Sequence, residues 1–229
     1  MSYRLLVFDW DGTLVDSAGR IVSCMRAAAR EAGLPLLPEA ELREVIGLGL
    51  PQALARLFPG AEAVRLERFV AAYRRHYLEG AHQVVRPFPD AGELLAALEA
   101  RGYWLAVATG KSRAGLERSL DEHGWRRHFL ASRCADETAS KPHPQMLLEL
   151  MEELQVAPEE TLMIGDTEYD VLMARAAGAD ALGVAHGVHG RERLLAQGAL
   201  ACVPGLRGVL AWLEQRPGAA PAAGEEAHG

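Results

Sequence analysis

Short apolar runs alternate along most of this chain with longer amphipathic stretches, and this alternation restricts the possible folds more than any other feature. The runs cover residues 5–8, 104–108, 129–131, 162–164 and 181–184. Runs that are apolar throughout are typical of strands buried on both faces of a parallel sheet. Strands separated by helices predict an α/β fold with a doubly wound, Rossmann-like parallel sheet, in which sites gather at the carboxyl ends of the strands.

Residues that typically start or stop helices mark the stretches between these runs. Asp90, with Glu93 three residues later, is expected to cap a helix that Gly102 ends. Ser112 is expected to open a helix that continues to His123. Further helical patterns cover 144–154, 168–177 and 206–215.

One long segment breaks the alternation. Residues 17–86 show helical patterns at 20–32, 38–45, 52–57 and 63–78, and no convincing strand. We therefore interpret them as a helical domain inserted after the first strand, so that residues 1–16 and 87–216 form a discontinuous α/β core. The tail at 217–229 is rich in Pro, Ala, Gly and Glu, and we expect it to be disordered.

Two pairs of carboxylates follow predicted strands. Asp9 and Asp11 come directly after the first run, and Asp166 and Asp170 follow the run at 162–164. Carboxylate oxygens that act together with substrate phosphate are typical of Mg²⁺ sites. Either pair alone also fits a surface turn or acids at a helix N-terminus, and the first pair fits the start of a calcium loop whose later ligands are missing. The two pairs at two strand ends predict a site for a hard cation.

Complementary groups follow two further strands. Thr109, Gly110 and Lys111 offer a hydroxyl and free backbone N–H groups at the start of a helix, which is a natural anion site. Lys141 precedes Pro142 beyond the run at 129–131, and Lys111 and Lys141 are the only lysines among 24 basic residues. An ordinary strand end or a solvated charge explains any one of these residues. It does not explain four such sites at successive strand ends.

The order Asp-x-Asp-Gly-Thr-Leu, Thr-Gly-Lys, Lys-Pro and Gly-Asp-x-x-x-Asp resembles the haloacid dehalogenase superfamily over residues 4–186. Residues 17–86 look like the helical, C1-type cap of that superfamily, and the whole is most similar to its phosphoglycolate phosphatase-like members. The resemblance implies a Mg²⁺-dependent phosphatase that acts on a small phosphate monoester, such as phosphoglycolate or a sugar phosphate.

The resemblance also implies a role for each motif residue. Asp9 is the nucleophile that forms an aspartyl phosphate, and Asp11 is the general acid and base. Mg²⁺ is held by the carboxylates of Asp9 and Asp166 and the backbone carbonyl of Asp11, while Asp170 orients a water on the metal. The groups implied to hold the phosphate oxygens are Thr109, the Gly110 amide and Lys141.

Competing functions differ from this one in identifiable residues. A dehalogenase does not need the carboxylate of Asp11, and a phosphonatase needs a cap lysine, which residues 17–86 lack. A phosphosugar mutase uses the same two aspartates and stays open as an alternative. A phosphate-binding regulator without turnover is expected to lack Asp9 or Asp11, whereas both are present.

Substrate choice is expected to depend on the cap. The turn at 47–51 is our candidate for a loop that approaches the active site, because Gly47 and Gly49 permit close backbone contact. Lys111 is a third candidate specificity residue. His186 and His189 are expected to be solvent-facing loop histidines without a catalytic role. One or two of the cap arginines are candidates to bind a substrate carboxylate, and the cap arginines include Arg20, Arg43, Arg56, Arg65, Arg68, Arg74 and Arg75.

Charge and composition limit the expected partners. A formal charge of -7 provides no basic field for nucleic acid or an anionic membrane, so the expected partner is a small phosphorylated metabolite. The sequence contains no run of about 18 apolar residues and begins without a signal peptide pattern, which predicts a cytoplasmic protein. Cys24, Cys134 and Cys202 are odd in number, far apart and without metal-ligand spacing, so they are expected to be small buried residues and not part of a disulfide framework or zinc site. The sequence is compatible with a monomer or a homodimer.

Overall fold

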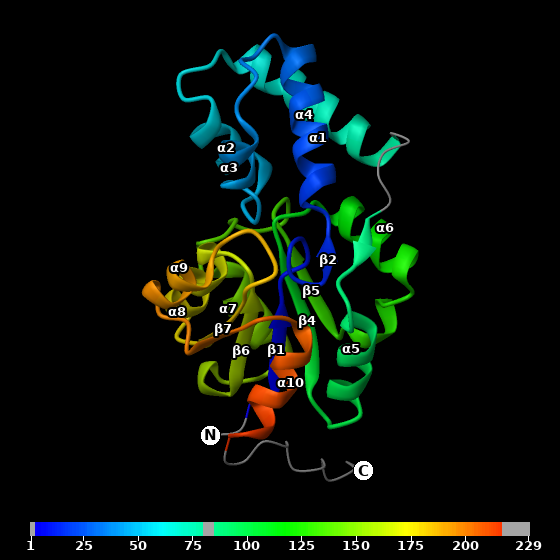
Figure 1. Ribbon diagram of the computed structural model, residues 1–229, viewed down its shortest axis with the longest axis vertical. Coiled ribbons are helices and arrows are strands. Elements are labelled where there is room, and N and C mark those ends of the chain that lie inside the picture. Colours follow the sequence, from blue (N-terminus) through cyan, green and yellow to red (C-terminus); the bar gives the residue numbers. More distant parts are fainter. Residues whose placement is uncertain (1–2, 80–84, 217–229) are drawn as a thin grey trace.

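The computed structural model describes residues 3–79 and 85–216, so the tail that we expected to be disordered lies outside the described residues. A helical cap lies above a core that contains the main sheet, and two chain crossings join them (Figure 1). At this junction β2 (Val15–Asp16) and β3 (Arg86–Pro87) form a two-stranded antiparallel ribbon.

A six-stranded sheet, in which every neighbouring pair is parallel, forms the centre of the core. β1 lies between β4 and β6, and the strand order reverses there, which places the crevice of a doubly wound sheet at its carboxyl end. The predicted α/β fold with a doubly wound parallel sheet is confirmed. In spatial order the strands are β5 (Ala131–Cys134), β4 (Trp104–Thr109), β1 (Leu5–Phe8), β6 (Thr161–Gly165), β7 (Asp180–Val184) and β8 (Ala201–Val203).

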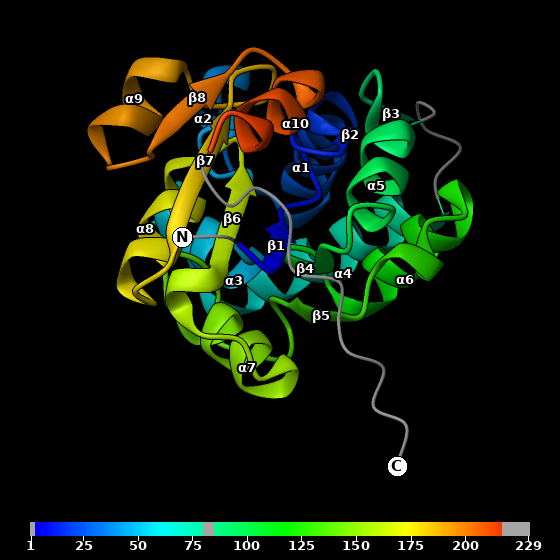
Figure 2. The ribbon, with the colours of Figure 1, turned by 90° about the horizontal axis from the view of Figure 1, so that it is seen from below.

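Helices cover both faces of this sheet (Figure 2). Successive side chains of a strand point to opposite faces. Leu6 and Phe8 therefore enter the apolar cluster beneath one set of helices, and Leu5 and Val7 enter the cluster beneath the other. The first set comprises α5 (Ala91–Glu99), α6 (Arg113–His123) and α10 (Leu206–Glu214), and the second comprises α7 (Gln145–Leu154), α8 (Glu168–Ala176) and α9 (Arg191–Ala196).

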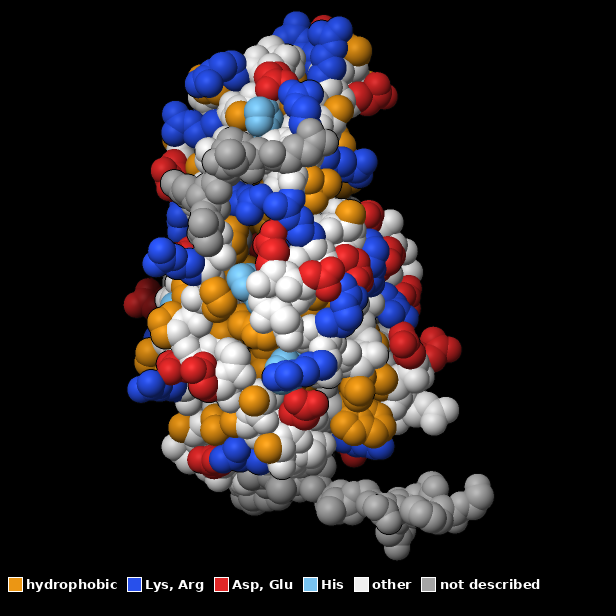
Figure 3. Space-filling view, turned by 90° about the vertical axis from the view of Figure 1, so that its right-hand side faces the viewer, with side chains coloured by type: hydrophobic (Ala, Val, Ile, Leu, Met, Phe, Trp, Pro, Cys, Tyr) orange, Lys and Arg blue, Asp and Glu red, His pale blue; other side chains and the backbone are white. Residues whose placement is uncertain are grey.

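The cap has an apolar cluster of its own. Phe69 is fully buried in this cluster, and Ala28 and Ala29 let α1 approach α4 closely. The cap helices are α1 (Ala18–Ala32), α2 (Glu39–Arg43), α3 (Leu50–Leu57) and α4 (Ala63–Glu79). On the face shown in Figure 3, basic side chains gather over the cap, whereas both signs of charge are interspersed over the core.

The strand predicted at 129–131 is displaced, because β5 begins at Ala131 and continues through Ser132 and Arg133 to Cys134. This strand lies at the edge of the sheet, where half-exposed polar side chains are tolerated, so its sequence is not apolar. Strand β8 and helix α9 were not predicted, since they have only three and six residues and show no clear period.

The two predicted helix starts have different outcomes. Ser112 caps α6, and its Oγ accepts a hydrogen bond from the Gly115 N–H at 3.3 Å. The prediction that the Asp90 side chain caps α5 is wrong. The backbone of Asp90 is left-handed, with φ 67°, and its carboxylate pairs with Arg207 at 2.8 Å instead.

The three cysteines are free and buried, as predicted. Across residues 3–79 and 85–216, no helix combines the length and the hydropathy that crossing a bilayer requires.

Candidate active site at the carboxyl ends of the strands

The sheet brings four motif residues to one edge. Asp9 follows β1, Thr109 ends β4, Lys141 lies in the loop after β5, and Asp166 follows β6. All four are buried, with exposed fractions of 1% or less. Neighbouring parallel strands end at the same edge of a sheet, which is why residues more than 150 positions apart in sequence meet here.

Asp9 has one bonded and one unbonded carboxylate oxygen. Its Oδ1 accepts hydrogen bonds from the Trp10 N–H at 2.6 Å and contacts Lys141 Nζ at 2.8 Å. Its Oδ2 is buried and has no hydrogen-bonding partner among the described residues. Burial, together with the nearby Asp170 and Asp166 carboxylates, raises the pKa of Asp9 well above its ordinary value. A buried oxygen without a partner usually marks a place where a ligand or ion completes the site.

Asp9, Asp166 and Asp170 form an acidic cluster, in which one carboxylate oxygen from each residue lies within 4.8 Å of the others. Asp166 accepts hydrogen bonds from the Thr13 hydroxyl at 2.7 Å and the Val188 N–H at 2.8 Å. Burial and the charge of Asp170 raise the pKa of Asp166 to about 7. Three converging carboxylates cost free energy unless a cation compensates their charge.

Lys141 compensates this charge only in part. Its Nζ lies 2.6 Å from Asp170 Oδ1 and 2.8 Å from Asp9 Oδ1, and the surrounding carboxylates raise its pKa despite complete burial. Two of the three carboxylates therefore share one ammonium. The hard oxygen donors of this cluster fit a divalent cation such as Mg²⁺.

Backbone packs directly against these acids. A Cβ atom on Gly12 would lie 2.3 Å from Asp166 Oδ2, and one on Gly187 would lie 2.1 Å from the same atom. Only glycine permits both segments to approach the carboxylate this closely. The backbone around Gly12 and the backbone around Gly187, which are far apart in sequence, therefore both pack against the Asp166 carboxylate.

The Asp11 carboxylate is not part of the acidic cluster in the described residues. Its Oδ1 accepts hydrogen bonds from Ser17 Oγ at 2.5 Å and Lys111 Nζ at 2.9 Å. Lys111 Nζ also donates to the hydroxyl of Tyr77, on cap helix α4, at 2.5 Å. Lys111 therefore connects the second motif aspartate with the cap, and its pKa is raised because Asp11 and Tyr77 stabilise the ammonium.

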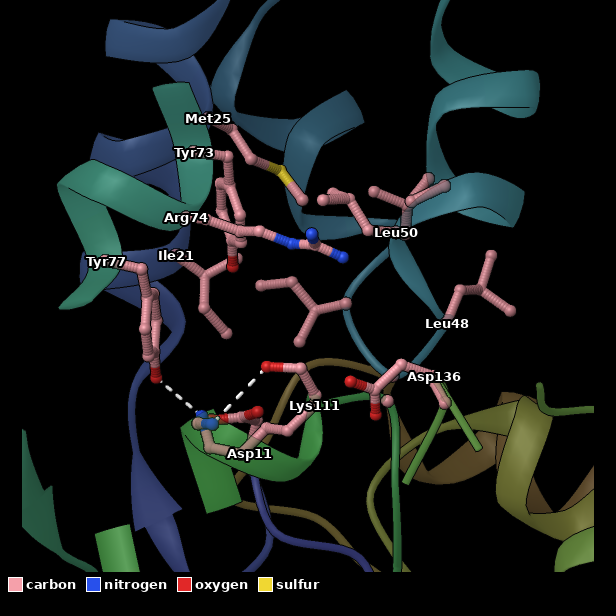
Figure 4. A pocket seen from close by; sticks show the side chains of 18 of the residues that line it. Asp11, Ile21, Met25, Leu48, Leu50, Tyr73, Arg74, Tyr77, Lys111 and Asp136 are labelled. Carbon is pink, nitrogen blue, oxygen red and sulfur yellow. Dashed lines mark hydrogen bonds and ion pairs between the residues drawn. The ribbon is translucent and has the colours of Figure 1, made fainter. Parts of the chain in front are cut away.

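A cavity of about 160 Å³ lies between the cap and the core. Asp9, Asp11, Gly110 and Lys111 line its core side, and residues of α1, α3 and α4 line its cap side (Figure 4). The predicted acid, nucleophile and anion-binding loop thus open onto one space.

The turn at 47–51 reaches the core. A Cβ atom on Gly110 would lie 2.7 Å from the Leu48 carbonyl and 2.8 Å from the Gly47 carbonyl. The Gly49 N–H donates to Ser140 Oγ at 2.6 Å, next to Lys141. Gly47 also lines the cavity, so this turn forms part of the cavity wall.

A second contact between cap and core lies on the side of α8. Tyr169 OH donates to the Glu44 carbonyl at 2.6 Å and accepts from Arg56 at 2.7 Å. The carboxylate of Glu44 accepts from Arg193 at 2.7 Å, and Arg193 also pairs with Glu168 at 2.6 Å. The cap is therefore fastened to the core on two sides.

Several site residues were missed by the sequence interpretation. Thr13 lies within the first motif and could have been identified from it, whereas Ser17, Tyr77 and Val188 carry no local sequence signal.

His186 contacts the Thr13 carbonyl at 2.9 Å through Nε2. His189 Nδ1 accepts from the Glu168 N–H at 3.0 Å. The expectation that both histidines face solvent is wrong for His189, which is only 2% exposed.

Comparisons with known proteins agree with this geometry. The family model described as haloacid dehalogenase-like hydrolase matches residues 6–184. A protein of Dickeya dadantii named "Probable phosphatase IndB" is 39% identical over 84% of this chain and 85% of its own length. A phosphoglycolate phosphatase of Vibrio cholerae is 32% identical over 83% of this chain and 88% of its own. A solved structure of a haloacid dehalogenase-like family hydrolase from Streptococcus pneumoniae has a TM-score of 0.80 and 25% identity, and the match covers 92% of this chain and 98% of that one.

Proposed function

The chain belongs to the haloacid dehalogenase-like hydrolase family and is a phosphatase, and from this premise we propose that it hydrolyses a small phosphate monoester through an aspartyl phosphate on Asp9. The observation that carries the proposal is the buried, unbonded Oδ2 of Asp9. Among the described residues it has no hydrogen-bond donor, while Lys141 and the Trp10 N–H hold the other oxygen of the same carboxylate. A nucleophile needs one oriented oxygen that is free to react.

In the first step, Asp9 Oδ2 attacks phosphorus and the bond from phosphorus to the ester oxygen breaks. Thr109 Oγ, the Gly110 N–H and Lys141 Nζ bind the phosphoryl oxygens and stabilise the charge that develops on them. Asp11 gives a proton to the departing ester oxygen, so that the product leaves as an alcohol.

In the second step, Asp11, now a carboxylate, takes a proton from a water molecule. The water oxygen attacks phosphorus, and the bond between phosphorus and Asp9 breaks to release inorganic phosphate. Lys111 and Ser17 keep the Asp11 side chain in one orientation for both proton transfers.

The proposed cofactor is Mg²⁺, which Asp9, Asp166 and the Asp11 backbone carbonyl would hold, with Asp170 from the same cluster orienting a water on the metal. When bound, it neutralises the negative charge of the carboxylates and of the phosphate. The contact of Asp170 with Lys141 at 2.6 Å gives Asp170 a second task, which is to position the phosphate-binding ammonium.

The test is hydrolysis of acetyl phosphate by the wild type with Mg²⁺, by the wild type with EDTA, and by Asp9→Asn with Mg²⁺. Because acetyl phosphate also hydrolyses spontaneously, we expect phosphate release above the rate without enzyme only in the first case. Trapping of radiolabelled phosphate on the wild type, but not on Asp9→Asn, reports the covalent intermediate. Full activity of Asp9→Asn would refute the role of Asp9, and phosphate transfer to a second sugar instead of water would favour the mutase alternative.

A further inference from the structure

The wall of the cavity above Asp9 is mostly hydrocarbon. Besides two tyrosines, nine apolar residues of the cap line this space, and five of them are at most 6% exposed, so packing fixes their positions. These five are Ile21, Met25, Val45, Ile46 and Ala53, and the other four are Leu48, Leu50, Pro51 and Leu78. A leaving group attached to a phosphate at Asp9 has to enter this space, because Asp9 and the apolar wall line the same cavity.

The polar side chains that line the cavity from the cap side are few, namely Tyr73, Arg74 and Tyr77. The hydroxyl of Tyr77 is already bonded to Lys111 at 2.5 Å. A leaving group with many hydroxyls would therefore bury some of them without partners, which is unfavourable. An apolar leaving group would instead gain from contact with this wall.

Arg74 differs from the other cap arginines. Of the nine arginines within residues 17–79, it is the one that lines the cavity, and Figure 4 shows its side chain extending over this space from α4. Arg20, by contrast, donates to the Tyr77 carbonyl, and Arg56 donates to Tyr169. Within the described part of the chain, no acid pairs with the Arg74 guanidinium. It is suited to bind an anionic group at the end of the ligand that lies away from the phosphate.

We propose that the substrate is the phosphate ester of a bulky apolar alcohol that carries an acidic group, with the apolar part against the cavity wall and the acidic group at Arg74. This inference rests on the proposed phosphatase function. The proposed substrate differs from the substrates of phosphatases whose leaving group is a sugar or glycolate.

The first experiment compares esters of primary alcohols with the same ring size, because their leaving groups differ mainly in polarity. We expect kcat/KM for cyclohexylmethyl phosphate to exceed that for glucose 6-phosphate by about 100-fold, and to exceed that for phosphoglycolate by about tenfold. Equal or reversed preferences would overturn the proposal. Acetyl phosphate distinguishes failure of the substrate proposal from failure of the proposed phosphatase function. If the wild type hydrolyses it and Asp9→Asn does not, the phosphatase function stands whatever the preference among esters.

The second experiment reduces the size of the cavity. Ala53→Leu adds volume at the apolar wall, and Ala55→Leu adds the same volume on the exposed side of α3. We expect Ala53→Leu to lower kcat/KM for cyclohexylmethyl phosphate about tenfold and to leave acetyl phosphate hydrolysis unchanged. Ala55→Leu should alter neither. An unchanged cyclohexylmethyl rate in a folded Ala53→Leu protein would place the leaving group elsewhere.

The third experiment tests the acidic group. Adding a 4-carboxyl group to cyclohexylmethyl phosphate should raise kcat/KM about tenfold in the wild type, and Arg74→Gln should abolish this gain without affecting the uncharged ester. Arg68→Gln, on an exposed part of the same helix, is the matched control and should keep the gain. A gain that persists in Arg74→Gln would remove Arg74 from the proposal.

Discussion

The individual carboxylates of the site differ in what surrounds them. Asp166 is completely buried beside Asp170, and its hydrogen bonds from Thr13 and the Val188 N–H do not offset these two effects. Its pKa consequently rises from 3.8 to about 7. In the folded protein without metal, Asp166 holds its proton at pH values where the unfolded chain has already lost it.

A pH dependence of stability follows from this pKa. Because the folded-state pKa is the higher one, the contribution of Asp166 to stability is fully present below pH 3.8 and is lost as the pH rises through about 7. In EDTA, Asp166→Asn should therefore raise Tm at pH 8 by about 3 °C or more, and the gain should shrink towards pH 5. Mg²⁺ should stabilise the wild type more at pH 8 than at pH 5. Thermal unfolding across this pH range measures both effects, and a gain from Asp166→Asn that does not depend on pH would contradict the prediction.

Lys111 and Asp11 form a second buried ion pair, with side chains that are 5% and 10% exposed. Lys111→Met leaves the Asp11 carboxylate without its cation, and we expect a loss of about 3 kcal/mol in the free energy of unfolding. Tyr77→Phe removes only one hydrogen bond from the same ammonium, and its cost should be about 1 kcal/mol. Urea unfolding of both variants provides the comparison. Equal costs would mean that the contact with the cap, and not the pair with Asp11, makes the main contribution of Lys111.

At the scale of elements, the loop after β4 and the cap turn at 47–51 fit together without space for a side chain. The clash of a Cβ atom on Gly110 would be with two backbone carbonyls, which cannot rotate away as a side chain can. Gly110→Ala should displace the cap turn and lower kcat/KM by about 100-fold while the core stays folded. Gly92→Ala, where the nearest atom is 3.6 Å away, is the control and should leave activity unchanged. Wild-type activity in Gly110→Ala would show that catalysis does not need the turn in this position.

The whole molecule combines a core and a cap, which are fastened to each other on two sides of the cavity. On the α8 side, Glu44 and Arg193 are 44% and 32% exposed, so their ion pair is screened by solvent and contributes on the order of 0.5 kcal/mol. Loss of this pair should favour opening of the cap without unfolding either part. Cap motion of this kind would let the substrate enter and the products leave.

Glu44→Gln should therefore increase amide hydrogen exchange in residues 45–50 by about twofold and leave Tm nearly unchanged. Glu41→Gln, an exposed change on α2, serves as the control. Exchange that is equally slow in Glu44→Gln and the wild type would show that the remaining contacts, such as Gly49 with Ser140, hold the cap by themselves.

The sequence by itself determined the layered α/β architecture and the motif residues at the strand ends. Burial of a strand on both faces leaves a local apolar run, and parallel strands present their carboxyl ends at one edge, so both inferences need only neighbouring residues. The same reasoning failed for the edge strand β5, which has a neighbouring strand on one side only and is therefore not apolar throughout. It also failed at Asp90, where the backbone takes a left-handed conformation.

Only the tertiary structure decided which groups pair across the site and what lines the cavity. Asp11 meets Lys111 and Tyr77, and Arg74 lies over an apolar wall, because the cap folds back onto residues that are distant in sequence. These contacts depend on how two separately packed apolar clusters are placed against each other, and no local period in the sequence encodes that placement.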